Sequence, residues 1–421
     1  MAPDDVSPAS TESAPVSPLQ SDEVDAFLDL DAAAFGARMS KGFESLVRKA
    51  MTLDRVVASR DDGALAGSAA SEHSVMTVPG LGRLPAAMVV AVAVLPSHRR
   101  QGRLRTLMRY QLDDLRSRGE VVAALYASEG GIYGRFGYGP ATFGATYTID
   151  KRVAHLARPA RDLAPGRVRL VHRDDAAEAF PAIYRDYAPT RAGELDRGEI
   201  DYTSALGDPG AEELNRRFYA VYQEDDHLDA YVGYEVAAMN PPAHGPRRLI
   251  VHELCALTPE AYLAVWEFLL GIDLTVELIA AGRPLDEPVK WSLAEPRQLR
   301  CTSSGDRSWI RLVDVATCLA ARHYATAGRI VIGVDDPFCP WNTGSYCLTV
   351  DEDWGPGDVA STKADPDLHL DASTLASIYL GGVSPSALGD AGRIRQSTPG
   401  SIPLAARMFA NDRPPFCLTP F

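Results

Sequence analysis

The feature that most constrains the fold is a long apolar strand followed by a basic turn and an amphipathic helix. The run Ala86–Leu95 (AAMVVAVAVL) is apolar throughout, and Pro96 ends it. This composition is typical of a strand buried on both faces. Across Gln101–Arg118 the apolar residues recur at helical spacing, and a second apolar strand, Val121–Leu125, follows. The pattern predicts a strand–loop–helix–strand unit of the α/β class.

Two further units follow along the chain. The second contains a β-α-β arrangement like the first, in which Thr258 caps a helix that begins at Pro259, but it lacks the basic turn. The third contains helices and strands from Ser308 onward and ends in an apolar tail. We therefore expect a leader and three domains, with the boundaries 1–20, 21–155, 156–303 and 304–421.

Composition narrows the classes of function. The 421 residues include 42 Lys and Arg against 56 Asp and Glu, a net charge of −14. A chain this acidic is a poor candidate for binding nucleic acid and favours a cationic small molecule as its partner. No apolar run approaches the roughly 20 residues that span a bilayer, so we expect no membrane span. Met1–Gln20 lacks the features of a signal peptide, and we expect a disordered leader on a cytoplasmic protein.

The cysteines give no sign of a metal site. None of the six forms a C-x-x-C pair, and no histidine lies at zinc-finger spacing from them. We expect no metal, and we expect most of these thiols to be reduced and buried.

The turn between the first strand and its helix carries a cluster of cations. Its sequence from Leu95 to Arg105 is LPSHRRQGRLR, which includes four arginines around Gly102. A helix N-terminus offers unpaired amides and the positive end of a dipole, and glycine lets the backbone approach an anion closely. The turn therefore predicts a pyrophosphate site. The alternative is a solvated basic helix start that binds nothing.

This turn resembles the acetyl-CoA pyrophosphate loop of the GNAT acetyltransferases, in which Arg/Gln-x-x-Gly-x-Gly/Ala follows a buried strand. Arg99 and Gly102 match, whereas Leu104 replaces the last small residue. The segment 127–140 (ASEGGIYGRFGYGP), together with the terminal Phe421, is similar to the Eis (enhanced intracellular survival) N-acetyltransferase family. This resemblance covers nearly the whole chain. It implies two tandem GNAT-like units, the second degenerate, then a sterol-carrier-protein-like α/β domain, and a homohexamer.

The resemblance also implies how acetyl-CoA would be bound. Main-chain groups on the first strand would bind the pantetheine arm, namely those of Val92, Ala93 and Val94. Residues of the turn would hold the phosphates, namely Arg100, Gln101, Gly102, Arg103, Leu104 and Arg105. Ser128 and Glu129, beyond the next strand, would contact the far side of the cofactor.

In the same way, Tyr133 would be the general acid and the α-carboxylate of Phe421 the general base. The chemistry is workable, because a phenol near pKa ~10 can protonate a thiolate near ~8.5 at a cost of about 2 kcal/mol. A free carboxylate near ~3.5 is a weak base, but burial raises its pKa, and the tail from Phe416 is apolar enough to be buried. The alternatives are that Tyr133 is a core aromatic and that the tail only packs.

The acceptor is less defined than the donor. Two acidic groups that line the amine pocket in family members are missing here, because those neighbourhoods read Gly36-Ala37-Arg38 and Pro420. Overall acidity still favours an amine, so aminoglycosides, polyamines and lysine side chains of proteins stay open as acceptors. A non-catalytic acyl-CoA or lipid carrier is the alternative from another class, motivated by the apolar third unit.

Overall fold

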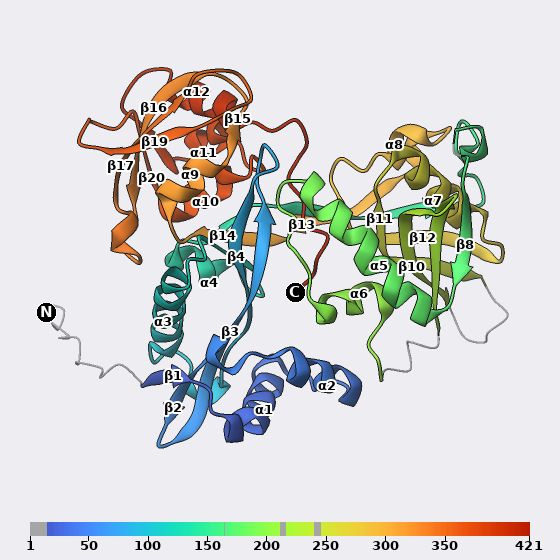
Figure 1. The fold of residues 1–421 in the computed structure, drawn as a ribbon, viewed down its shortest axis with the longest axis horizontal. Coiled ribbons are helices and arrows are strands. Elements are labelled where there is room, and N and C mark those ends of the chain that lie inside the picture. Colours follow the sequence, from blue (N-terminus) through green and yellow to red (C-terminus); the bar gives the residue numbers. More distant parts are fainter. Residues whose placement is uncertain (1–14, 164, 211–215, 240–245) are drawn as a thin grey trace, which may run out of the picture. The chain divides into compact units, whose positions relative to one another are not determined.

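The structure is a computed structural model that describes residues 15–163, 165–210, 216–239 and 246–421 (Figure 1). The chain forms two compact units. Unit 1 consists of Met1–Met39, Met51–Glu72 and Val89–Arg118. Unit 2 consists of Ser40–Ala50, His73–Met88 and Gly119–Phe421.

The folded chain begins earlier than the sequence predicts. Residues 1–14 of the expected leader lie outside the described residues, but Val16–Pro18 forms strand β1, which pairs antiparallel with β2 (Val56–Asp61). Strand pairing satisfies the backbone groups of a segment whose Pro- and Ser-rich composition suggested disorder. The prediction of a leader up to Gln20 is therefore wrong for β1.

Unit 1 is a sheet covered on both faces by helices. Its strand order is β1-β2-β3-β4. Only the first part of β3 (Ala64–Thr77) and the last part of β4 (Arg83–Val94) belong to this unit. Val56 and Ala58 share a core cluster with Phe27 of α1 (Val24–Phe35), whereas Val57 packs with Leu107 of α3 (Arg103–Ser117). The alternation follows from the period of two along a strand. It places α1 and α3 on opposite faces.

In unit 2, β4 runs parallel to β5 (Val122–Tyr126), as in the predicted strand–helix–strand unit. The order continues through β14 (Ser308–Leu312) to β6 (Gly139–Pro140), and both neighbours of β14 are antiparallel to it. The short helix α4 (Gly130–Tyr133) lies between β5 and β6.

The second sheet has the order β13-β7-β12-β11-β10-β9-β8. Its strands are β7 (Phe143–Asp150), β8 (Arg167–Val171), β9 (Arg217–Glu224), β10 (His227–Ala238), β11 (Arg247–Ala256), β12 (Thr275–Pro284) and β13 (Arg300–Asp306). Helices α7 (Pro259–Gly271) and α5 (Arg173–Tyr187) belong to different core clusters of this sheet. Strands β11 and β12 are parallel, which confirms the second β-α-β arrangement.

The C-terminal part contains a sheet of order β19-β17-β16-β20-β21. Its strands are β16 (Gly328–Asp335), β17 (Gly344–Val350), β19 (Asp358–Thr362), β20 (Leu368–Asp371) and β21 (Ile394–Gln396). Its helices are α9 (Val315–Ala321), α10 (Ala372–Tyr379), α11 (Pro385–Asp390) and α12 (Ser401–Met408). All eight residues of α10 are buried, and Asp371 caps the helix by accepting a hydrogen bond from Thr374 N. One core cluster joins this sheet to β5 and β14.

Two strands cross the boundaries that the sequence predicts. β7 was assigned to the first domain but pairs with β12 and β13 of the second sheet. β14 was assigned to the third domain but pairs with β5 of the first sheet. The sequence of a strand does not show which distant strand it pairs with, because its side chains alternate between the two faces of the sheet whatever its partner is.

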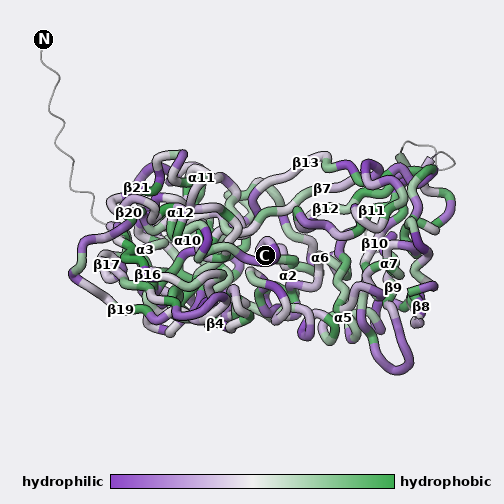
Figure 2. Tube along the Cα trace, turned by 90° about the horizontal axis from the view of Figure 1, so that it is seen from above, coloured by the Kyte–Doolittle hydropathy of each residue, from purple (hydrophilic) through white to green (hydrophobic). Residues whose placement is uncertain are grey.

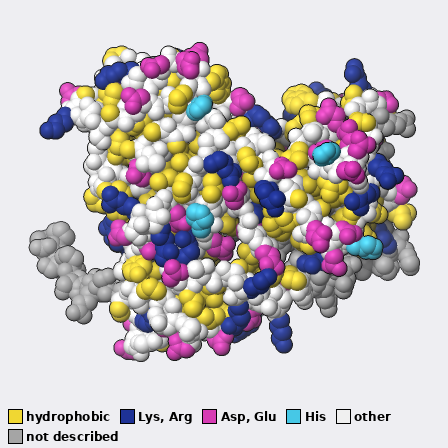
Figure 3. Space-filling model, viewed as in Figure 1, with side chains coloured by type: hydrophobic (Ala, Val, Ile, Leu, Met, Phe, Trp, Pro, Cys, Tyr) yellow, Lys and Arg dark blue, Asp and Glu magenta, His cyan; other side chains and the backbone are white. Residues whose placement is uncertain are grey.

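Hydropathy and charge are distributed as expected for a packed interior with a mixed surface. Figure 2 shows hydrophobic stretches along the strands and helices and hydrophilic stretches in several connecting loops. In Figure 3 acidic and basic side chains are interspersed over the visible face. Among the described helices, none has both the length and the apolar character needed to cross a membrane.

Candidate active site

The predicted cofactor residues of β4 and the following turn lie in unit 1. The parallel pairing of β4 with β5 covers Ala86–Met88 only. Ala91 then takes a left-handed conformation, with φ 49°, and its carbonyl accepts a hydrogen bond from Ser68 Oγ at 3.1 Å. A left-handed alanine within a strand marks a local irregularity. Such a break in regular pairing suits a strand whose main-chain groups serve a ligand.

The turn before α3 has the geometry of an anion site. Arg100 has φ 64°, and Gly102, the N-cap residue, has φ 80°. No side chain in the described part of the chain caps this helix, and a Cβ added at Gly102 would meet nothing within 4 Å. Because the first amides of a helix have no intrahelical partner, this open N-terminus fits the pyrophosphate of acetyl-CoA.

The arginines of the turn do not all face outward. Arg100 and Arg105 are exposed, as are Gln101 and Gly102. Arg103 is buried, and its guanidinium donates to Ser59 Oγ at 3.2 Å and to the carbonyl of Arg60 at 2.9 Å. It also forms an ion pair with Asp61, which lowers the pKa of that carboxyl.

The predicted phosphate role therefore does not fit the Arg103 side chain. This guanidinium ties the start of α3 to β2, and only the main-chain N–H of Arg103 is left for a ligand. Leu104 has an apolar side chain and is likewise limited to its main chain.

The residues predicted to do the chemistry lie in unit 2. Tyr133 ends α4 and is 5% exposed. Burial raises the pKa of its phenol, the negative charge of Glu129 acts in the same direction, and a hydrogen bond with Ser128 opposes them. Ser128 and Glu129, which were predicted to contact the cofactor, thus act on Tyr133. The phenol stays protonated at neutral pH, as a general acid must.

Phe421 lies against the strand that leads to Tyr133. Its ring packs edge-on against Tyr126, the last residue of β5, with the centroids 5.1 Å apart. The Tyr126 hydroxyl donates to the carbonyl of Thr419 at 2.9 Å. The tail therefore reaches the end of β5, after which Ser128 and Tyr133 follow in the chain.

The tail runs between two cores of unit 2. Phe416 and Leu418 belong to one core cluster, whereas Cys417 belongs to the other. The amide of Phe416 donates to the carbonyl of Ala192 at 2.9 Å. Next to it, Gly193 has φ 96°, and a Cβ there would lie 3.0 Å from the carbonyl oxygen of Phe416. The buried tail that the sequence predicts is confirmed for residues 416–419, whereas Pro420 is exposed and Phe421 is partly buried.

Sequence reasoning missed the polar side chains that hold this tail. Glu194, Arg197 and Tyr184 come from the segment after α5 and from α5 itself, and Arg307 donates to the carbonyl of Cys417 at 3.1 Å. None of them belongs to a motif, and only the folded chain brings them to the terminus.

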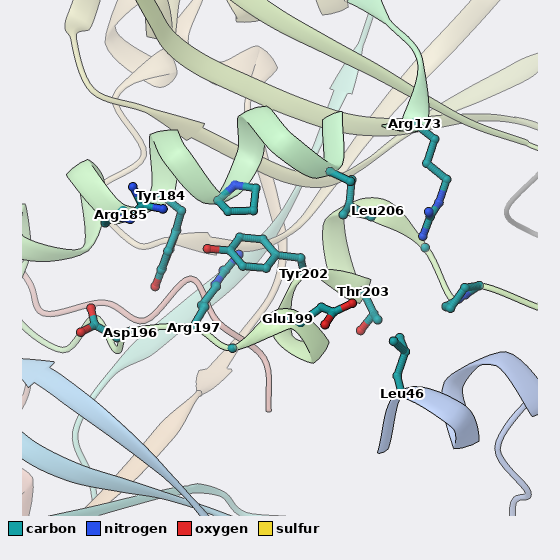
Figure 4. A pocket seen from close by; sticks show the side chains of 15 residues that line it. Leu46, Arg173, Tyr184, Arg185, Asp196, Arg197, Glu199, Tyr202, Thr203 and Leu206 are labelled. Atoms are coloured by element: carbon teal, nitrogen blue, oxygen red, sulfur yellow. The ribbon is translucent and has the colours of Figure 1, made fainter. Parts of the chain in front are cut away.

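A pocket of about 790 Å³ opens beside these side chains, wholly within unit 2 (Figure 4). Tyr184 and Arg197, which hold the tail, also line it. Its charged lining residues are Arg173, Arg185, Arg197, Asp196 and Glu199. Cations and anions are thus mixed in its walls.

Known protein families match three parts of the chain. Two families described as acetyltransferase (GNAT) domains match residues 15–141 and 193–312, and a sterol carrier protein domain matches residues 315–418. An uncharacterized N-acetyltransferase of Streptomyces coelicolor is 36% identical, over 94% of this chain and 97% of its own length. The N-acetyltransferase Eis of Mycobacterium tuberculosis is 32% identical, with the same coverage of both chains.

The chain belongs to the Eis family of N-acetyltransferases. The crystal structure of Eis1 from Mycobacterium abscessus agrees with a TM-score of 0.85 at 32% identity, covering 97% of this chain and all of that one. A GCN5-related N-acetyltransferase from Anabaena variabilis shares the fold, with a TM-score of 0.83 at 19% identity and coverage of 97% and 100%. The predicted architecture of two GNAT units followed by a sterol-carrier-protein-like domain is confirmed. As an Eis-family member the protein is an N-acetyltransferase, and its GNAT domains imply the use of acetyl-CoA.

Proposed function

We propose that this protein moves an acetyl group from acetyl-CoA to the amine of a small cationic molecule or of a lysine side chain. The amine attacks directly in a ternary complex, with Tyr133 as general acid and the carboxylate of Phe421 as general base. The observation that carries this proposal is the anchoring of the chain terminus on Tyr126, at the end of the strand that leads to Tyr133. We further expect a cytoplasmic homohexamer, as the family resemblance implies.

The donor would be held by unit 1. The open N-terminus of α3 and the exposed Arg100 and Arg105 offer donors to the phosphates, while main-chain groups of Val92–Val94 bind the pantetheine arm. Acetyl-CoA supplies the acetyl group and a thiol as leaving group. Its binding at unit 1 should therefore be separable from the chemistry at Tyr133 and Phe421.

Tyr133 would deliver the proton that the departing thiol requires. Since burial raises the pKa of Tyr133 above the ordinary value of about 10, the phenol stays loaded through the whole neutral range. We therefore expect kcat/KM to show no falling limb between pH 7 and about pH 9. A rate profile measured with saturating acetyl-CoA tests this, and a falling limb that disappears in Tyr133→Phe would contradict it.

The terminal carboxylate would accept the proton of the attacking amine, directly or through one water. Phe421 is partly buried and its side chain packs on the apolar core, which holds the end of the chain in place. No cysteine belongs to the motif around Tyr133, so direct attack needs no acyl-enzyme.

The acceptor class is supported by charge alone. A net charge of −14 favours an amine. The arginines in the walls of the pocket beside the tail, together with the missing acids near Phe35 and at Pro420, favour acceptors with few positive charges over aminoglycosides carrying several. Lysine side chains and simple amines are therefore the first acceptors to try.

Adding two residues, Gly-Ser, after Phe421 tests the proposed base. The extension moves the α-carboxylate while keeping every side chain, so we expect kcat to fall about 100-fold with an unchanged Kd for acetyl-CoA. A chain with the same two residues added at the N-terminus is the control. Full activity of the C-terminally extended chain would overturn the role of Phe421. Acetyl-CoA binding with no transfer by the wild-type protein to any amine would favour an acyl-CoA carrier.

A further inference from the structure

A chain of buried hydrogen bonds ends on the C-terminal tail. Arg197 Nε donates to Thr419 Oγ1 at 2.8 Å, and Thr419 Oγ1 lies 2.9 Å from the hydroxyl of Tyr184. That hydroxyl lies 2.8 Å from Glu194 Oε2, and both carboxylate oxygens of Glu194 lie 3.0 Å from the amide of Leu418. The side chains of Glu194, Arg197 and Thr419 are fully buried.

The donors and acceptors fix the direction of this chain. Arginine can only donate, so Thr419 accepts from Arg197 and has its own proton left for the oxygen of Tyr184. Tyr184 in turn has its proton left for Glu194 Oε2 or for the carbonyl oxygen of Leu195, each at 2.8 Å. Glu194 also accepts from the amide of Leu418. With the tail in place, Arg197 gains Thr419 as a partner beside Glu253, and Glu194 gains Leu418 as a partner beside Tyr184.

The cluster contains one guanidinium and two carboxyl groups, all within unit 2. Arg197 forms a bidentate ion pair with Glu253, at 2.8 and 3.1 Å, and its guanidinium lies 3.8 Å above the ring of Tyr184. Burial raises the pKa of Glu194, whereas its hydrogen bonds with Leu418 and Tyr184 and the charge of Arg197 oppose this. A buried carboxylate without these donors would be costly, so the cluster and the tail depend on each other.

The chain between this anchor and the terminus is stiff. Pro420 fixes its own φ, and a residue before proline, here Thr419, is restricted as well. Phe421 follows directly, with its ring on Tyr126. Hydrogen bonds that fix the positions of Leu418 and Thr419 therefore also restrict the position of the Phe421 carboxylate.

We propose that Glu194 and Arg197 are positioning residues that set the place of the terminal carboxylate by holding Leu418 and Thr419. This inference rests on the proposed role of Phe421 as the base. It assigns a function to two buried charges that touch no reacting atom.

The test uses Thr419→Val, which keeps the shape of the side chain and removes the hydroxyl. We expect kcat to fall about tenfold, the Kd for acetyl-CoA to stay unchanged, and Thr419→Ser to restore the rate. The matched control is Thr142→Val, which removes another fully buried hydroxyl of unit 2, one that lies 2.6 Å from Ser308 Oγ. It should lower thermal stability but leave kcat within twofold of wild type.

A cycle with the C-terminal extension separates this inference from the proposed function. If Thr419 acts through the carboxylate, Thr419→Val should cost nothing further in the extended chain. A fully active extended chain would refute the base itself. An inactive extended chain with a fully active Thr419→Val, or equal losses from Thr419→Val in both backgrounds, would refute only the positioning role. If Thr419→Val does not fold, Glu194→Gln decides in the same cycle, because its NH2 group replaces one of the two oxygens that accept from the amide of Leu418.

Discussion

The chain contains the same local arrangement twice, and the two copies differ at one helix end. In each, a helix follows a strand and leads to a second strand parallel to the first, α3 between β4 and β5 and α7 between β11 and β12. Gly102 is the N-cap residue of α3, and no side chain among the described residues caps this helix. Thr258 is the N-cap residue of α7, and its hydroxyl accepts a hydrogen bond from Ala261 N at 3.1 Å. Pro259, the first residue of the helix, has no amide hydrogen.

The difference shows how one architecture can serve binding or stability. At α7, Thr258 accepts hydrogen bonds from the amides of Ala261 and Tyr262, so that helix end contributes to folding. Among the described residues no side chain caps α3, and we propose that its first amides bind an anion beside the exposed Arg100. The two helices occupy the same place in the two β-α-β arrangements, and on our proposal the residues at their N-termini determine which one binds the cofactor.

Placing a negative charge at the open helix end should have the largest effect. Gly102→Asp puts a carboxylate where the phosphates would bind, on a left-handed residue, and we expect the Kd for acetyl-CoA to rise about 100-fold. Thr258→Asp is the matched control, because aspartate is also a good cap, and its Kd should equal that of the wild type. Isothermal titration calorimetry measures both. Equal Kd values for the two variants would refute the contrast.

Substituting the two arginines near Gly102 should have different consequences, since Arg100 is expected to affect the binding of acetyl-CoA and Arg103 the stability of the fold. Arg100→Ala removes an exposed cation, so we expect an approximately tenfold weaker Kd, a shallower salt dependence and unchanged unfolding. Arg103→Ala removes the buried guanidinium that contacts Ser59 and Asp61, and should lower the free energy of unfolding by about 2 kcal/mol. Denaturant unfolding and acetyl-CoA titration of both variants check this. A loss of binding without a loss of stability in Arg103→Ala would show that its side chain reaches the phosphates.

Removing the cap of α7 should have the smallest effect. Thr258→Ala leaves Ala261 N without its acceptor, and such losses cost about 1 kcal/mol of stability. Acetyl-CoA binding should not change. A weaker Kd for acetyl-CoA in this variant, measured by the same titration, would mean that the second unit takes part in binding.

The local elements could be predicted from the sequence, and their pairing could not. The apolar periodicity of α3, the cap of α7 and the buried strand β5 follow from short patterns. The pairing of β7 with β12 and of β14 with β5 could not be predicted, since pairing between strands far apart in the sequence leaves no local pattern. β1 was missed because its few residues gain their order from β2.

For the candidate site as well, some residues could be predicted from the sequence and others could not. Arg100, Gly102 and Tyr133 stand in motifs, and the sequence places them. Arg103 stands in the same motif, but its side chain turns inward to Asp61, which charge counting cannot detect. Glu194 and Arg197 are unremarkable in sequence, and only the approach of a tail more than 200 residues later gives them a role.

The most direct test of the account is amine-dependent release of thiol from acetyl-CoA by the protein with a free C-terminus. Lysine peptides, polyamines and aminoglycosides serve as acceptors, for the wild type and for Tyr133→Phe. We expect amine-dependent release by the wild type and an approximately 100-fold lower kcat in Tyr133→Phe, with the same Kd for acetyl-CoA. Equal rates for the two proteins would contradict the assignment of Tyr133 as the general acid on which the account rests.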